Sequence, residues 1–325
     1  LFVHIIALVA YAVEGVAEHL PVPLPPVPAE KKADPTFVAL PWYWVKEEHV
    51  LDVADSARRW FIGFRDVARA TDIRTATFGL VPWSAVNHKL PLILLESGRL
   101  AGLFLSAANS LCFDYLVRQK IGGASLGFFV LKQVPMPVPE SLAESDAAFI
   151  LPRVAELACT AWDVQPFLDD LWRESDAGLR TAIERQWCEN REATGGHTYD
   201  PPEWYTPPED RCPLPPFKWN EDRRARLRAE LDAYYAKLYG LNRKQLRYIL
   251  DPADLTPREI ETILDDTEEV SDPLDPEGYR RRAEASTFPG ETFRVLKEKE
   301  IARYGEYRTR RLVLEAWDKL HGDIA

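Results

Sequence analysis

The sequence has few residues of the kinds that build metal centres and disulfide scaffolds. Its four cysteines, Cys112, Cys159, Cys188 and Cys212, include no CxxC pair, and its six histidines are scattered without an HExxH motif. Structural zinc sites need closely spaced ligand pairs, and disulfide scaffolds need far more cysteine per residue. We therefore expect four reduced thiols in a cytoplasmic protein, and no metal site.

The sequence also lacks the motifs that mark several enzyme classes. It has no Walker loop for nucleotide phosphates and no Gly-x-Ser-x-Gly elbow for a serine nucleophile. The acid-lysine-acid run at 298–300 superficially resembles part of a nuclease motif, but charges spaced like this along a helix usually form a solvated face. We expect no catalytic residue in this chain.

No hydrophobic run is long enough to cross a bilayer. Residues 1–13 are apolar apart from His4, but they are too short for a span and lack the basic leader of a secretory signal. A proline-rich linker follows at 21–28. Because the chain begins with Leu1 and its single methionine is Met136, we expect a fragment whose apolar, proline-rich leader (1–36) is not native sequence.

Charge is distributed unevenly along the chain. The net charge is -11 overall, yet residues 56–133 carry ten basic against four acidic residues, a net charge of +6. Residues 141–215 carry fifteen acidic against six basic residues, a net charge of -9. The first of these segments can face a polyanion although the chain is acidic as a whole.

Hydrophobic periodicity and proline punctuation predict an α+β protein. We expect a mixed α/β domain at 37–139 and a mostly helical domain at 140–325, with a proline- and tryptophan-rich loop at 200–219. The expected strands are 76–81, 90–95 and 128–134. The expected helices are 100–117, 150–159, 164–173, 177–190, 222–239, 243–249 and 306–320. Gly240 should end one helix, Asn242 should cap the next, and Thr256 to Glu259 should form a capping box.

Several segments, taken in order, resemble one known family. They are FVALPWYWV (37–45), GFRDVARATDIRT (63–75), NSLCFDYLVRQKIGGASLGFFVLKQVP (109–135), LYGLNRKQLRYIL (238–250) and YGEYRTRRLVLEA (304–316). Together they are similar to the target-recognition region of large type IIG-like adenine-specific DNA methyltransferases, whose relatives occur in BREX and DISARM phage-defence systems. The resemblance covers most of residues 37–320.

The resemblance implies that the chain binds double-stranded DNA and selects the target for a methyltransferase catalytic domain. The family uses S-adenosylmethionine, but the glycine-rich cofactor turn and the Asn/Asp-Pro-Pro-aromatic loop that holds a flipped adenine are missing here. Asp200-Pro-Pro-Glu203 lacks the aromatic residue, and Pro215-Pro-Phe217 lacks the leading amide or acid. The cofactor therefore belongs to the missing domain. The alternative is a protein-interaction subunit of a defence complex that never reads DNA.

The predicted DNA contacts combine cations, hydroxyls, an amide and two glycines, which suit phosphates and base edges. They are Arg65, Arg69, Thr71, Arg74, Thr75, Lys89, Arg118, Lys120, Gly122, Gly123, Lys132 and Gln133.

Five of these residues also have a structural explanation. Arg65 can pair with Asp66, the two glycines can simply stop a helix, and Lys132 and Gln133 can mark an exposed strand end. Where the family commonly has His and Asn, this chain has Ser125 and Gly127, so base contacts from these two positions are not expected.

Overall fold

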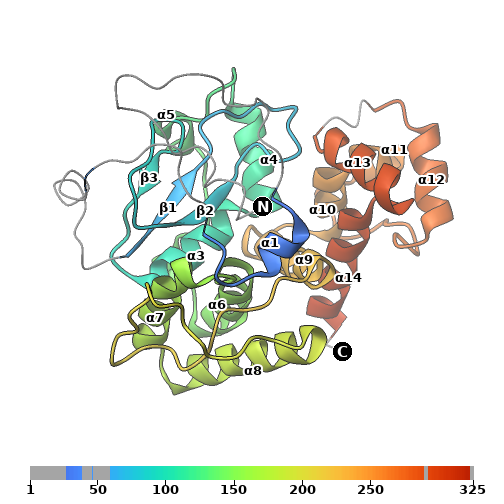
Figure 1. Cartoon of the computed structure of the whole chain (residues 1–325). Helices are drawn as coiled ribbons and strands as arrows, with labels where there is room; N and C mark the ends of the chain where they lie inside the picture. The colour runs from blue at the N-terminus through green and yellow to red at the C-terminus, as the bar shows by residue number, and fades with distance from the viewer. Residues whose placement is uncertain (1–26, 39–45, 47–58, 289–291, 323–325) are drawn as a thin grey trace. The chain divides into compact units, whose positions relative to one another are not determined.

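The computed structural model describes residues 27–38, 46, 59–288 and 292–322 (Figure 1). The leader at 1–26 and most of the 37–45 motif lie outside these residues. The chain forms two compact units: unit 1 comprises Leu1–Asp66, Thr77–Ser106 and Val138–Asn220, and unit 2 comprises Val67–Ala76, Ala107–Pro137 and Glu221–Ala325.

Unit 1 contains a small antiparallel sheet with strand order β2-β1-β3. The strands are β1 (Trp60–Phe64), β2 (Phe78–Pro82) and β3 (Leu92–Ile93). Aromatic and aliphatic side chains favour this extended, buried backbone, and every residue of β1 is buried. Gly63 is needed in the middle of the sheet because a Cβ there would lie 2.8 Å from Cγ2 of Val81.

Among its described residues, unit 1 also contains five α-helices, of which α7 packs against β1. They are α1 (Ala29–Ala33), α3 (Gly98–Ala108), α6 (Glu144–Ala158), α7 (Gln165–Glu174) and α8 (Ala177–Thr194). The ring of Trp60 packs edge-on against Phe167 of α7 at 5.2 Å, and its indole N–H donates to Asp170 at 2.7 Å. Helix α3 approaches α6 so closely that a Cβ on Gly102 would lie 2.6 Å from Leu151.

Unit 2 is helical. Its helices are α4 (Leu111–Lys120), α5 (Phe128–Leu131), α9 (Glu221–Leu238), α10 (Arg243–Leu250), α11 (Pro257–Glu261), α12 (Pro276–Ala285), α13 (Arg294–Tyr304) and α14 (Arg308–Gly322). Three predicted helix ends are confirmed. Asn242 and Thr256 each cap a helix within a capping box, and Gly240 has the left-handed φ of 72° that favours glycine.

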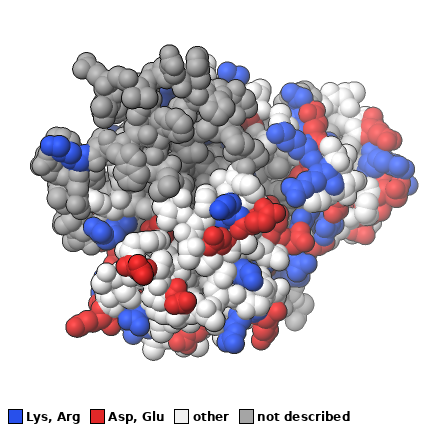
Figure 2. Space-filling model, viewed as in Figure 1, with Lys and Arg blue, Asp and Glu red and all other residues white. Residues whose placement is uncertain are grey.

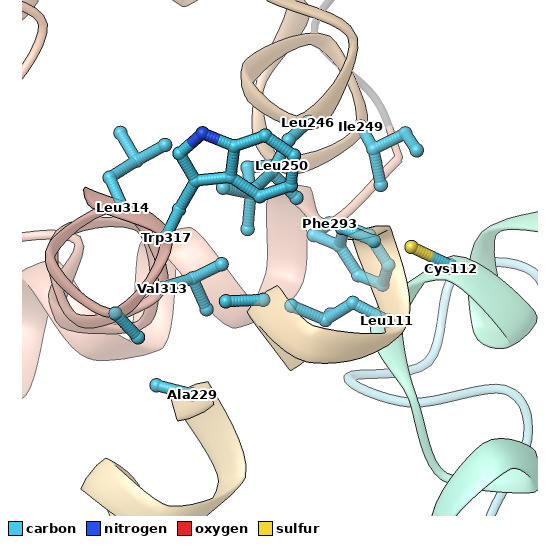
Figure 3. Close-up of a cluster of buried hydrophobic side chains, with 13 residues drawn as sticks. Leu111, Cys112, Ala229, Leu246, Ile249, Leu250, Phe293, Val313, Leu314 and Trp317 are labelled. Atoms are coloured by element: carbon cyan, nitrogen blue, oxygen red, sulfur yellow. The ribbon is translucent and has the colours of Figure 1, made fainter. Parts of the chain in front are cut away.

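The core of unit 2 joins distant parts of the sequence. Leu111 and Cys112 of α4 contact a buried cluster formed by α9, α10, Phe293 and α14 (Figure 3). Trp317 and Leu314 of α14 and Leu246 and Leu250 of α10 lie within the same cluster. The segment around α4 therefore belongs to the same core as the C-terminal helices.

The structure corrects two expectations. The predicted helix at 100–117 is two helices, α3 and α4, separated by a break at which Ser110 caps α4. Residues 128–131 of the predicted strand at 128–134 form the short helix α5. One crossing between the two units lies between Pro137 and Val138, next to the predicted boundary at residue 139, and the chain also crosses between the units at four other points.

The coarse α+β class is confirmed, since the described helices accompany one small antiparallel sheet. Among the described residues, no single helix combines the length and the apolar composition that a bilayer span requires, and only α3 with α4 reaches them as a bent pair.

Candidate nucleic-acid interface

The structure brings most of the predicted contacts into unit 2. Ten of the twelve lie there, and only Arg65 and Lys89 belong to unit 1. The ten come from two sequence segments: a first loop (residues 67–76), and α4 with the residues that follow it. We call residues 121–127 the second loop.

Asp114 of α4 organises the first loop. Its buried carboxylate accepts hydrogen bonds from the backbone N–H groups of Thr75 at 2.8 Å and Ala76 at 2.7 Å. It also lies 3.8 Å from the guanidinium of Arg74, which donates to the carbonyl of Asn109. Thr75 is fully buried, and its hydroxyl donates to the carbonyl of Arg69. The loop is therefore held in one conformation by α4.

Arg118 completes this arrangement from one helical turn further along α4. Its guanidinium pairs with Asp114 at 3.2 Å and donates to the carbonyls of Ala70, Asp72 and Ile73 in the first loop. It also donates to the carbonyl of Thr292 and lies over the ring of Phe293, with 4.6 Å to the ring centroid. Burial lowers the pKa of Arg118 below its usual range, and Asp114 counteracts that shift.

These contacts revise the role predicted for three residues. Arg118 and Thr75 are buried, and the side chain of Arg74 is only 14% exposed. Their polar groups bind the chain itself, so they position the first loop instead of contacting a phosphate.

The two loops are joined to each other. The backbone N–H of Ala68 donates to the carbonyl of Ala124 at 3.2 Å, and Val67 pairs with Ser125 in an isolated antiparallel bridge. Segments about 50 residues apart in sequence thus form one continuous surface.

This surface carries three exposed cations, and the carboxylate of Asp72 in the first loop accepts a hydrogen bond from the backbone N–H of Arg69 at 3.2 Å. Arg69, Lys120 and Lys132 are exposed, and their side chains form no ion pair among the described residues. Residues 115–139 contain no Asp or Glu, although the chain has 51 acidic residues. By contrast, acidic and basic side chains lie side by side over the C-terminal helices (Figure 2), as in the pairs Arg280–Glu277 and Arg294–Glu298.

The fold itself does not account for the two glycines of the second loop. Gly122 and Gly123 are exposed, neither has a positive φ, and a Cβ on either would meet nothing within 4 Å. Neither backbone strain nor internal packing therefore requires glycine at these positions. The absence of side chains leaves the backbone N–H groups open to close approach from outside.

Lys132 and Gln133 lie at the end of α5, not at a strand end. Lys132 is the C-terminal cap of α5, and its backbone N–H donates to the carbonyl of Phe128. The side-chain amide of Gln133 donates to the carbonyl of Phe129 at 3.1 Å, and the residue is exposed. Thr71 in the first loop is exposed as well.

The two remaining predicted contacts lie in unit 1. The ammonium of Lys89 pairs with Asp66 at 2.9 Å, while Arg65 follows β1 and donates its backbone N–H to Thr77. The alternative expected for Arg65 was an ion pair with Asp66; the ion pair that Asp66 forms here is with Lys89.

Sequence reasoning missed two residues of this region. Asp114 is the single acid of α4, it is fully buried, and its spacing of four residues from Arg118 was the available signal of an ion pair. Phe129, 81% exposed on α5, was hidden in a run that resembles a buried strand.

No group of three or more potential metal ligands occurs among the described side chains. Comparisons with protein-family models, with curated proteins and with solved structures found no match.

Proposed function

We propose that the chain binds duplex DNA through the first loop, the second loop and the residues that follow the second loop as far as Lys132. Arg69, Lys120 and Lys132 contact phosphates, and the backbone at Gly122 and Gly123 allows close approach of the sugar-phosphate chain. The observation that carries the proposal is a surface with three unpaired exposed cations within an acidic chain. A cation that neutralises a phosphate releases a counterion condensed on the DNA, and this release favours binding.

The resemblance to adenine methyltransferases supplies the biological role in this proposal. The chain selects the target site, and a separate domain or subunit holds S-adenosylmethionine and transfers the methyl group. Asp114 and Arg118 act as positioning residues that keep the first loop in place. A DNA target of this kind places the chain in the cytoplasm, within a restriction-modification or phage-defence system.

A binding experiment with charge-removing variants tests the proposal. The triple variant Arg69→Ala, Lys120→Ala, Lys132→Ala should bind a fluorescent duplex much more weakly than the unmodified chain. Because the three side chains are exposed, thermal stability should remain within the range of ordinary surface substitutions.

The matched control is Arg185→Ala, which removes an exposed cation from α8 within the acidic segment 141–215. It should bind DNA like the unmodified chain. Equal affinity of the triple variant and the Arg185→Ala control would contradict the proposed surface.

A further inference from the structure

Among the large hydrophobic residues that the structure describes, Phe129 has the most exposed aromatic side chain, at 81% of its full accessibility. It is not on a frayed segment. Helix α5 is closed by hydrogen bonds from Val130 and Leu131 to the carbonyl of Gly127, and it lies between buried Leu126 and Val134. A fixed backbone thus holds a phenyl ring in solvent, where its hydration is unfavourable unless a partner covers it.

The charged residues near Phe129 in the sequence indicate the chemistry of that partner. Lys132 follows it by three residues, so the two side chains lie one helical turn apart. The second loop and Lys120 precede it in the same acid-free segment, residues 115–139. A flat apolar ring beside unpaired cations is complementary to a nucleic-acid base joined to its phosphates.

Leu264 provides the contrast within the same unit. It is 83% exposed, as open as Phe129, but it stands beside Asp265, Asp266 and Glu268. The carboxylates around Leu264 repel a phosphate backbone. Exposure of an apolar side chain alone therefore does not define the nucleic-acid surface. The combination of an aromatic ring with unpaired cations occurs at Phe129.

We propose that Phe129 enters the duplex and stacks on a base, while Lys120 and Lys132 hold the flanking phosphates. Aromatic side chains that insert between base steps unstack them and kink the duplex. The inference rests on the proposed DNA binding and deepens it, because it names the side chain that distorts the target. In this proposal α5 presents the ring of Phe129 to DNA in a fixed position.

The test uses the full chain and two short duplexes that differ only by one T·T mismatch. A 2-aminopurine next to the variable pair reports unstacking through its fluorescence. Inserting the ring costs less free energy where the base pair is already weak, as at the mismatch. The unmodified chain should therefore bind the mismatched duplex more tightly and raise the 2-aminopurine signal on it.

Substitutions at Phe129 separate stacking from general apolar contact. Phe129→Ala should weaken binding to the mismatched duplex roughly fivefold to a hundredfold, the range for loss of one base–aromatic stack, and remove the fluorescence rise. Phe129→Trp should retain both properties, and Phe129→Leu should lose most of the fluorescence rise. The control Leu264→Ala, equally exposed, should behave like the unmodified chain. All four substitutions fall on exposed positions, and thermal melting verifies that the folds match.

Each contrary outcome has a separate meaning. If the unmodified chain binds duplex DNA and Phe129→Ala keeps its affinity and mismatch preference, the stacking inference is overturned while the proposed function stands. If Phe129→Leu matches the unmodified chain in affinity and fluorescence, the side chain at position 129 makes a general apolar contact, and aromatic stacking is overturned. If the unmodified chain binds no duplex, the proposed function fails and the inference fails with it.

Discussion

At the scale of single residues, burial separates the cations of the candidate interface into two groups. Arg118 is buried and donates to four backbone carbonyls, whereas Lys120, two residues later, is exposed. Arg74 and Arg69 differ in the same way within the first loop. Residues of one chemical type in one short motif thus divide between holding the loop and facing solvent.

Arg118→Ala should destabilise the protein strongly. The substitution removes the closer of the two ion-pair partners of the buried Asp114 carboxylate and leaves several carbonyls without donors. Removing one partner of a buried ion pair costs about 3–5 kcal/mol, so urea denaturation should show a loss of that order. Arg118→Lys keeps the charge but not the planar fork of donors, so its stability should lie between that of Arg118→Ala and that of the unmodified protein. A loss of less than about 1 kcal/mol would show that Arg118 does not hold the loop.

At the scale of elements, α4 is the part of the interface that the rest of unit 2 fixes in place. Its first backbone N–H, from Leu111, donates to Asp232 of α9 at 2.7 Å, and Ser110 caps the same end. Asp232 is buried, and burial raises its pKa to about 6, opposed by attraction to Arg74 and Arg228. Asp114 lies close enough to add a small repulsion.

This pKa shift predicts a pH dependence of stability. The folded state holds the proton of Asp232 more tightly than the unfolded chain, whose pKa is near 3.8. The stabilising contribution is therefore complete below about pH 4 and is lost as the pH rises through about 6. Above that range the carboxylate is ionised in a buried site, at a cost on the order of 3 kcal/mol.

Asp232→Asn should be more stable than the unmodified protein at pH 7 to 8 and should lose this advantage toward pH 4. Asparagine keeps the oxygen that accepts from Leu111, and it removes the desolvated charge, which is the largest influence on the pKa. Urea denaturation at several pH values measures the difference between the two proteins. Burial also raises the pKa of Asp163 to about 6. Asp163 is present in both proteins, so its contribution cancels from the difference in their stabilities. A pH-independent difference would refute the assignment.

The elements that sequence reasoning predicted correctly depend on neighbours a few residues away. Gly240, the cap at Asn242 and the capping box at Thr256 are local signals, and all three are found. The break between α3 and α4 is different, because the bond that fixes it comes from Asp232, 121 residues away.

The same reason explains what was mispredicted in the candidate interface. Arg118 was expected to contact phosphate, but its burial depends in part on Thr292, 174 residues away. Residues 128–131 were expected to form a strand because a short apolar run does not distinguish a strand from a helix. The exposure of Phe129 could not be read from that run.

At the scale of the whole molecule, the residues of the predicted recognition domain are divided between the two compact units. Leu111 and Cys112 lie in the same core as α9, α10 and α14 (Figure 3), and residues 37–139 contribute to both compact units. Removing the C-terminal helices exposes that core and takes away Asp232 from the start of α4.

A fragment of residues 37–139 should therefore lack a fixed tertiary structure. Near-UV circular dichroism should be weak, and heating should give no cooperative transition, whereas the full chain should melt cooperatively. The full chain at the same concentration is the control. A cooperative melt of the fragment would mean that the core in Figure 3 is not required for its folding.

The salt dependence of DNA binding by the full chain tests the central claim most directly. If Arg69, Lys120 and Lys132 each neutralise a phosphate, log K should fall linearly with log salt, and these three should account for a slope of about -2.7. The triple alanine variant should lose about that much of the slope, while Arg185→Ala should keep it. Binding that does not respond to salt, or a triple variant with an unchanged slope, would contradict the account.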